Sequence, residues 1–220
     1  MKPLLVFDLD GTLIDSAPDI IVAVNRTLMN HGKSALDDQT IISHIGEGIK
    51  RLIADLFMND KLEPADIINL EMEFLQIYEE EMLNKTSIYP GVEAFLESYE
   101  SPIAIITNKN EIPAKKIINH LGLDRFPWVG IFGADTLEER KPSPLPLNTM
   151  MKRADRTPKN TLMIGDGIPD MVSAQRAGVA ALAIEFGYSA PEVLNRYEPR
   201  AFLKNYSELP ALLQEIFPGN

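Results

Sequence analysis

A chain of 220 residues is long enough for a domain with a full hydrophobic core and a smaller accessory unit. Its 32 acidic and 21 basic residues give a formal net charge of -11, which repels nucleic acid and anionic membranes at long range. The sequence contains no cysteine, which excludes disulfides, thiolate nucleophiles and cysteine-based metal sites. Because no apolar run reaches transmembrane length and no secretory leader pattern is visible, we expect a cytoplasmic protein without nucleic-acid or membrane partners. The composition leaves open whether it is a monomer or a homodimer.

The first predicted element is a buried strand that ends at two carboxylates. The continuous apolar run at residues 4–7 is typical of a strand covered on both faces, as in a parallel sheet. Asp8 and Asp10 follow it and would emerge at the carboxyl end of the sheet, where open α/β folds bind their ligands. The alternative is that both aspartates only begin a turn, for which Gly11 supplies the backbone freedom.

A wholly helical region follows this strand. Apolar residues recur there at helical spacing, which predicts one helix over residues 37–45 and others that begin near Ser16, Ile49 and Pro64. The last of these helices carries several glutamates between its apolar positions, and we expect that glutamate-rich face to be solvated. The region is predicted to be one insertion, at about residues 14–86, after the first strand of an α/β domain. We call residues 14–86 the helical insertion.

From Tyr89 onward, predicted strands alternate with predicted helices, which is typical of right-handed β-α-β units and a parallel sheet. The strands are predicted at residues 103–107, 129–133, 161–165 and 179–185, and the helices at 111–121, 144–154, 169–177 and 208–217. The predicted fold is therefore a Rossmann-like α/β core with helices on both faces of a parallel sheet. Residues 1–13 and 87–220 would form this core domain, and residues 14–86 a small all-helical domain.

Polar residues also follow three of the later predicted strands. Thr107 and Asn108 could donate hydrogen bonds to an oxyanion, although taken alone the pair is more typical of a helix-capping turn. Lys141 precedes two prolines that stiffen the chain, although a lone lysine is usually just surface charge. Asp166 and Asp170 lie across a strand-to-helix turn, where Asp170 alone could simply favour the first helical turn.

The combination of these residues predicts a metal site. Asp8, Asp10, Asp166 and Asp170 would bring negative charges to neighbouring strand ends, and such a cluster cannot stay ionised without a counterion. Lys141 and a divalent cation would supply it, and ligands that are all oxygen favour Mg²⁺. The histidines show no paired spacing and are expected in ordinary surface or packing roles: His31, His44 and His120.

The order of these motifs resembles the haloacid dehalogenase superfamily, in its phosphatase branch with a helical cap after the first strand. The motifs are Asp-x-Asp-Gly-Thr-Leu at 8–13, an apolar strand with Thr-Asn at 107–108, Lys-Pro-x-Pro at 141–144 and Gly-Asp-Gly-x-x-Asp at 165–170. The segment 45–52, Ile-Gly-Glu-Gly-Ile-Lys-Arg-Leu, is also similar to phosphoglycolate phosphatases. Two positions depart from the branch, because Gly167 stands where serine is often found and Leu145 where an acid is frequent. These two departures put the choice among related substrates in question.

The resemblance implies a role for each core residue. Asp8 would attack phosphorus to form an aspartyl-phosphate, and Asp10 would act first as acid and then as base. Mg²⁺ would be held by the side chains of Asp8 and Asp166 and by the backbone carbonyl of Asp10, with Asp170 steering the water molecules of the metal. The phosphoryl oxygens would be bound by three residues: Thr107, Asn108 and Lys141.

The resemblance also implies that the helical insertion is a mobile cap that excludes water and contacts the leaving part of the substrate. Lys50 and Arg51, beside Gly46 and Gly48, are candidates for holding a carboxylate or second anion, unless both lie on the exposed side of their helix.

The leading hypothesis is a Mg²⁺-dependent phosphomonoester hydrolase for a small anionic metabolite, with 2-phosphoglycolate as the first candidate. A sugar phosphomutase of the same superfamily is the alternative, because it would keep the aspartyl-phosphate but return the group to its substrate. A receiver-like phospho-signalling module is disfavoured because it lacks the Asp-x-Asp spacing and the cap. A catalytically silent binding protein is disfavoured because every expected polar group is present.

Overall fold

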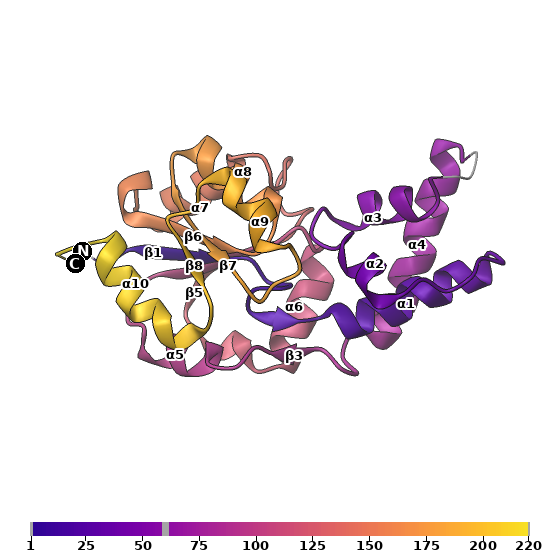
Figure 1. The fold of residues 1–220 in the computed structure, drawn as a ribbon, viewed down its shortest axis with the longest axis horizontal. Helices are drawn as coiled ribbons and strands as arrows, with labels where there is room; N and C mark the ends of the chain where they lie inside the picture. Colours follow the sequence, from indigo (N-terminus) through magenta and orange to yellow (C-terminus); the bar gives the residue numbers. More distant parts are fainter. Residues whose placement is uncertain (1, 59–61, 220) are drawn as a thin grey trace.

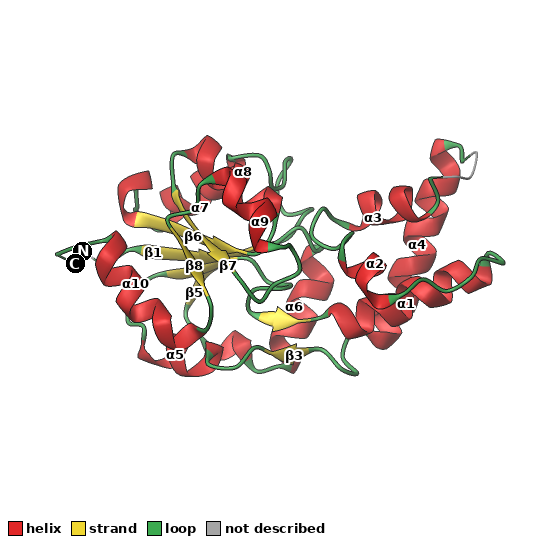
Figure 2. Cartoon of the chain, in the orientation of Figure 1, coloured by secondary structure: helices red, strands yellow, loops and turns green. Residues whose placement is uncertain are grey.

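The structure, a computed structural model, describes residues 2–58 and 62–219. Its largest element is a six-stranded sheet with the strand order β5-β4-β1-β6-β7-β8, in which every neighbouring pair is parallel. Figure 2 shows this sheet with helices on both sides. The strands of the sheet are β1 (Leu4–Phe7), β4 (Ile103–Ile106), β5 (Trp128–Phe132), β6 (Thr161–Gly165), β7 (Ala180–Ile184) and β8 (Ala201–Leu203). The predicted fold class, a parallel sheet within an α/β core, is confirmed.

The central strand β1 is buried on both faces because its side chains alternate between two cores. Leu5 and Phe7 belong to the larger core cluster, whereas Leu4 and Val6 belong to a second cluster on the opposite face of the sheet. The helices that surround the sheet are α5 (Val92–Ser98), α6 (Glu111–His120), α7 (Leu145–Arg153), α8 (Ile168–Ala177), α9 (Pro191–Leu194) and α10 (Leu209–Ile216). Two covered faces explain why the sequence of β1 is continuously apolar rather than alternating.

The helical insertion lies beside the sheet, next to the carboxyl ends of its strands (Figure 1). Its helices are α1 (Ala17–Asn30), α2 (Asp38–Ile42), α3 (Ile49–Leu56) and α4 (Pro64–Glu81). The chain leaves the core through β2 (Ile14–Asp15) and returns through β3 (Ser87–Ile88), and these two short strands pair antiparallel. The predicted boundaries at 14 and 86 therefore fall at this pair of strands. The division into two domains stays a prediction.

The second helix of the insertion is shorter than the sequence predicted. Periodicity favoured a helix over residues 37–45, whereas α2 ends at Ile42. Its start is fixed because the Asp37 side chain accepts a hydrogen bond from Thr40 N–H at 3.0 Å. Beyond α2 the chain turns toward the core through Gly46 and Gly48, whose φ values of +112° and +87° suit glycine. This loop brings residues 43–48 to the strand ends.

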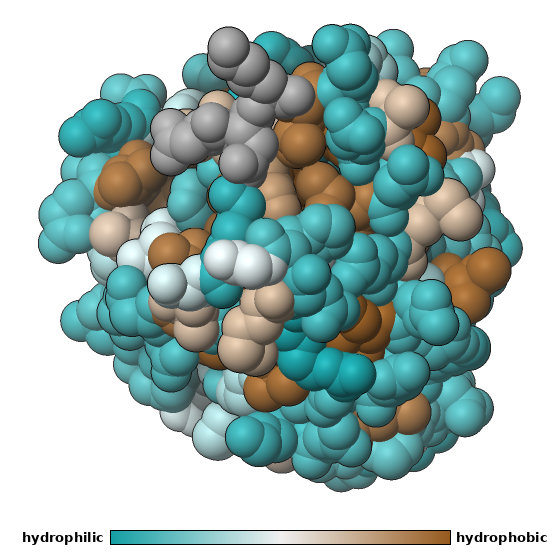
Figure 3. Space-filling view, turned by 90° about the vertical axis from the view of Figure 1, so that its right-hand side faces the viewer, coloured by the Kyte–Doolittle hydropathy of each residue, from teal (hydrophilic) through white to brown (hydrophobic). Residues whose placement is uncertain are grey.

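The outer end of the helical insertion is mostly hydrophilic, with smaller hydrophobic patches between the polar side chains (Figure 3). The glutamates of α4 are only partly solvated, because Glu79 and Glu80 are exposed whereas Glu71, Glu73 and Glu81 are half-buried. Within residues 2–58 and 62–219, none of the helices combines the length and the apolar character needed to cross a membrane.

Candidate active site

Asp8 occupies the first position after β1, at the carboxyl edge of the sheet. Its backbone N–H donates to the carbonyl of Ile164 in β6 at 2.9 Å, which continues the strand pairing to this residue. The carboxylate is fixed as well, because Oδ1 accepts from Leu9 N–H at 2.7 Å and lies 2.9 Å from Lys141 Nζ. The strand therefore holds one carboxylate at its tip with a defined orientation, facing a buried ammonium group.

Three carboxylates converge at this edge. Oxygen atoms of Asp8, Asp166 and Asp170 lie within 4.8 Å of one another, and all three residues are buried. Burial, followed by the charge of Asp170, raises the pKa of Asp8 to about 7 in spite of Lys141. Burial and then the charges of Asp8 and Asp170 raise the pKa of Asp166 well above its usual range. The ammonium group of Lys141 lies 2.6 Å from Asp170 Oδ1, but one positive charge cannot neutralise three carboxylates.

The donor set of this cluster fits a hard divalent cation. All three groups offer carboxylate oxygen, the ligand type that Mg²⁺ takes in preference to soft metals. Asp166 is oriented by Thr12 Oγ1, which donates at 3.2 Å, and by Tyr188 N–H, which donates at 2.8 Å to the other oxygen. Gly11 has a φ of +73°, and a Cβ built there would lie 2.1 Å from Asp166 Oδ2. Glycine is thus required at position 11 because φ is positive there and because the Asp166 carboxylate leaves no room for a Cβ.

Thr107 and Asn108 follow β4 and lie next to Asp8. The Asn108 side chain amide donates to the backbone carbonyl of Lys141 at 3.0 Å and to that of Gly46 at 3.1 Å. It therefore joins the core to the loop after α2. Asn108 Oδ1 is buried without a hydrogen-bond partner among the described residues, and Thr107 Oγ1 accepts from the N–H of Lys109 at 3.1 Å. Both predicted phosphate-binding residues of this strand are therefore brought to the site.

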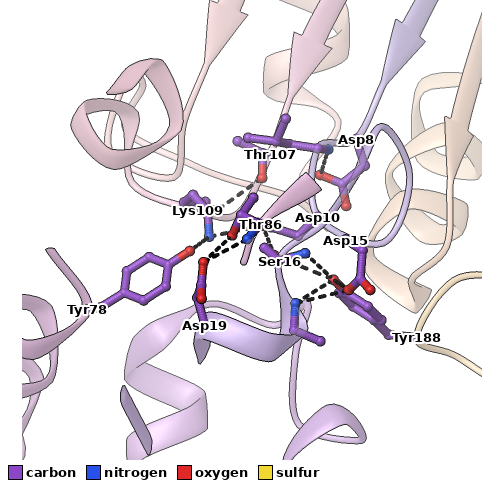
Figure 4. A network of polar contacts seen from close by, with 12 residues as sticks. Asp8, Asp10, Asp15, Ser16, Asp19, Tyr78, Thr86, Thr107, Lys109 and Tyr188 are labelled. Carbon is purple, nitrogen blue, oxygen red and sulfur yellow. Dashed lines mark hydrogen bonds and ion pairs between the residues drawn. The ribbon is translucent and has the colours of Figure 1, made fainter. Parts of the chain in front are cut away.

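Asp10 lies at the centre of a polar network, shown in Figure 4. Ser16 Oγ donates to Asp10 Oδ1, and Lys109 Nζ lies 3.0 Å from the same oxygen. Lys109 Nζ also donates to the hydroxyl of Tyr78 on α4 at 2.9 Å and lies 4.7 Å from the centre of its ring. Lys109 thus connects the core carboxylate Asp10 with a helix of the insertion.

Tyr188, in the loop after β7, holds the start of α1. Its hydroxyl accepts hydrogen bonds from Ser16 N–H at 2.8 Å and Ala17 N–H at 3.0 Å, and it donates to Asp15 Oδ1 at 3.1 Å. Because its own N–H binds Asp166, this one residue links the acidic cluster to the point where the chain leaves the core.

A cavity of about 80 Å³ lies between the strand ends and the helical insertion. Asp8, Asp10 and Lys109 line it on the core side, and Gly46 and Gly48 line it from the insertion. The structure also brings other residues of the insertion to this cavity, and their side chains are mostly apolar: Ile20, His44, Ile45, Ile49, Leu52, Phe74, Leu75 and Tyr78.

The two cationic candidates of the insertion lie elsewhere. Lys50 is exposed, and Arg51 is exposed with its Nε 2.9 Å from Asp55 Oδ2. Arg51 lines a second hollow of about 290 Å³ rather than the cavity with Asp8. Leu52 and Ile53 are the buried positions of α3, so helical geometry turns the preceding two residues away from the core.

Four residues of this site were not predicted from the sequence. Lys109 directly follows the Thr-Asn pair, so its position beside a strand end is a usable signal. Ser16 was predicted only to lie at the start of a helix. Tyr78 and Tyr188 gave no local indication, because they reach the site from distant parts of the chain.

Comparisons with known proteins agree with this geometry. The family model described as haloacid dehalogenase-like hydrolase matches residues 5–184. A phosphoglycolate phosphatase from Colwellia psychrerythraea is 35% identical over 94% of this chain and 95% of its own length, and one from Neisseria gonorrhoeae is 34% identical over 97% and 93%. A solved structure described as a predicted phosphoglycolate phosphatase from Haemophilus somnus has a TM-score of 0.89 at 25% identity, covering 97% of this chain and 98% of its own.

These relatives confirm the prediction of a phosphatase. The family model covers most of the chain, and the curated relatives match nearly all of it. The chain therefore belongs to the haloacid dehalogenase-like hydrolase family.

Proposed function

We propose that the chain is a Mg²⁺-dependent phosphomonoester hydrolase that forms an aspartyl-phosphate on Asp8, with 2-phosphoglycolate as the first candidate substrate. One observation carries the proposal. Asp8 borders both the three-carboxylate cluster and the cavity, and Asp10 lines the same cavity. A nucleophile, a proton carrier and a cation site thus surround one space that can hold a phosphate ester.

In the first step, the Asp8 carboxylate attacks phosphorus, the bond between phosphorus and the ester oxygen breaks, and Asp10 gives that oxygen a proton. In the second step, Asp10 takes a proton from water as the water attacks phosphorus. The bond between phosphorus and the Asp8 oxygen breaks, which releases inorganic phosphate and regenerates the Asp8 carboxylate and the protonated Asp10. The contacts of Asp10 suit this role, since Ser16 and Lys109 both meet Oδ1. The Asp10 carboxyl is thereby oriented with Oδ2 left to exchange protons.

The transferring phosphoryl group carries negative charge that its surroundings must balance. Lys141 Nζ, 2.9 Å from Asp8 Oδ1, is close enough to the nucleophile to contact a phosphoryl oxygen there. Thr107 and Asn108 also line the cavity. The Thr107 hydroxyl can donate to another phosphoryl oxygen, whereas the Asn108 amide can do so only by giving up one of its two carbonyl partners, Gly46 or Lys141. When bound by the side chains of Asp8 and Asp166 and the carbonyl of Asp10, with Asp170 beside it, Mg²⁺ would supply further charge stabilisation.

The names of the curated relatives favour a small substrate. The relatives at 34–35% identity are named phosphoglycolate phosphatases. 2-Phosphoglycolate has a leaving group of only two carbons.

The test is phosphate release from a panel of phosphomonoesters, with Mg²⁺ and with a chelator. We expect Mg²⁺-dependent release with the highest kcat/KM for 2-phosphoglycolate, and an Asp8→Asn variant slower by about 10⁴-fold or more. Asp124→Asn, at an exposed aspartate, is the matched control and should keep the wild-type rate. A near-native rate for Asp8→Asn would contradict the mechanism, and a 2-phosphoglycolate rate no better than that of an aryl phosphate would contradict the substrate.

The phosphomutase alternative is separated by its products. We expect free phosphate from sugar phosphates that turn over at all. An isomeric sugar phosphate in place of free phosphate would favour the mutase.

A further inference from the structure

Among the described residues that line the cavity beside Asp8, Lys109 is the one lysine or arginine. The rest of the charged lining is acidic, because Asp8 and Asp10 both face the space. The side chains from the insertion are mainly apolar and cannot replace the hydration of an anion. A substrate with a charged leaving group therefore meets one permanent positive charge there.

Lys109 is held in place from two sides. Its side chain is only 8% exposed, with Nζ 3.0 Å from Asp10 Oδ1 and 2.9 Å from the Tyr78 hydroxyl. An ammonium group has three N–H donors, and the described contacts of Nζ to side-chain oxygens use two of them. One donor remains for a ligand in the cavity.

Of the other cations near the site, Arg140 has its guanidinium against Gly48 but does not line the cavity, and three more have partners elsewhere. Lys141 pairs with Asp8 and Asp170 and is not among the residues that line the cavity. Arg51 pairs with Asp55 on the exposed side of α3. His44 does line the cavity, but its Nδ1 lies 3.5 Å from the same Asp55 carboxylate.

The chemistry of the leaving group matches the position of Lys109. In 2-phosphoglycolate a single methylene separates the ester oxygen from the carboxylate. If Asp10 protonates the ester oxygen, a cation in direct contact with Asp10 lies next to the place where that carboxylate must sit. Ethyl phosphate has the same carbon chain without the charge and lacks any group for this cation.

We propose that Lys109 is the specificity residue of this site and receives the carboxylate of the leaving group, while Tyr78 of the insertion positions its ammonium. The inference rests on the proposed function and deepens it. It assigns selection of the leaving group to Lys109, a core residue that contacts α4 through Tyr78, rather than to Lys50 and Arg51 on α3.

The experiment compares kcat/KM for 2-phosphoglycolate and ethyl phosphate in the Mg²⁺-loaded protein. In Lys109→Met, both esters lose a group that orients Asp10, but only 2-phosphoglycolate loses its carboxylate partner. We expect the preference for 2-phosphoglycolate over ethyl phosphate to fall by about 10- to 100-fold, the effect of a charge-assisted hydrogen bond. Most of the additional loss should appear in KM.

Two further variants separate charge from structure. Lys109→Arg keeps the charge, and we expect it to retain most of the preference even if both rates fall. Lys116→Met is the matched control, because Lys116, on α6, also joins the core to α4, through Glu79, but lies on the surface. It should leave the preference unchanged. If Lys109→Met does not fold, Lys109→Gln is used, which keeps donors for Asp10 and Tyr78 and removes the charge.

The outcomes are distinguishable. If kcat/KM fell by the same factor for both esters in every uncharged variant, the inference would be overturned and the proposed function would stand. A wild-type protein that prefers 2-phosphoglycolate and keeps that preference in Lys109→Met would also overturn it. A wild-type protein that releases phosphate from neither ester would refute the proposed function itself.

Discussion

Replacing Tyr188 with phenylalanine should destabilise the start of α1 and misplace Asp10. The Tyr188 hydroxyl uses its full hydrogen-bonding capacity, because it accepts from two N–H groups and donates to Asp15. Ala17 N–H has a second acceptor in Asp15 Oδ1 at 3.2 Å. Ser16 N–H has none among the described hydrogen bonds, and Ser16 is fully buried. Tyr188→Phe therefore leaves one buried donor unsatisfied.

The cost can be estimated from these contacts. An orphaned buried donor costs about 1–3 kcal/mol and the other lost hydrogen bonds about 1 kcal/mol, so the free energy of unfolding should fall by about 2–4 kcal/mol. In a chain of this size that lowers Tm by roughly 5–15 °C. Urea denaturation measures the loss in free energy of unfolding, and thermal melts measure the fall in Tm. We also expect kcat to fall, because the Ser16 hydroxyl that orients Asp10 moves when the start of α1 moves.

Tyr99→Phe is the matched control for this experiment. The Tyr99 hydroxyl donates a hydrogen bond to the carbonyl of Pro3 at 2.6 Å and also interacts with the Ser101 side chain, away from the site. It should cost about 1 kcal/mol and leave kcat unchanged. If Tyr188→Phe cost no more than Tyr99→Phe, or kept the wild-type kcat, the idea that Tyr188 anchors the insertion to the acidic cluster would be wrong.

Three other predictions follow from the same structure. Mg²⁺ should raise Tm relative to a chelator, because a cation bound only by the folded state stabilises it, and thermal melts over a Mg²⁺ series measure this. Gly11→Ala should destabilise far more than Gly32→Ala in urea titrations. Both residues have positive φ, but a Cβ at Gly11 meets Asp166 whereas Gly32 has open space around it, so the control should lose only about 1 kcal/mol. Asp19→Asn should cost about 2–3 kcal/mol in the same assay, because the buried Asp19 carboxylate accepts hydrogen bonds from the N–H and hydroxyl of Thr86 where the chain returns to the core. A smaller loss would show that this contact does not hold the insertion.

The sheet could be predicted from sequence because its strands are buried on both faces. The strand predicted at 161–165 coincides with β6, and the one at 103–107 exceeds β4 by a single residue. Continuous apolar runs of this kind have few other uses in an α/β pattern. The three-residue edge strand β8 (Ala201–Leu203) was missed because a strand that short carries no usable periodicity. The same is true of β2 and β3, which exist only because two distant segments meet.

The residues of the candidate site also differ in whether the sequence could predict their position. Residues that lie at strand ends could be placed from their position along the chain, since parallel strands bring their carboxyl ends to one edge. Asp8, Asp166 and Asp170 are an example. The contact between Lys109 and Tyr78 could not be derived in this way, because it depends on how α4 is oriented above the core. Lys50 illustrates the opposite problem, since a cation beside a flexible loop is not thereby turned toward the site.

Under the proposed function, charge predicts that cation and substrate binding are coupled. Among the described residues, the carboxylates of Asp8, Asp10, Asp166 and Asp170 pair with two ammonium groups, those of Lys109 and Lys141, so four negative and two positive charges leave an excess of two negative charges when all are ionised. Burial first, and then the neighbouring negative charges, raise the pKa values of Asp8 and Asp166. Under the proposed function, a divalent cation would remove this excess and let an anionic ester approach, in a chain whose net charge of -11 repels anions at long range. The excess that makes the cluster costly without a metal would thus make binding of the phosphate ester depend on the metal.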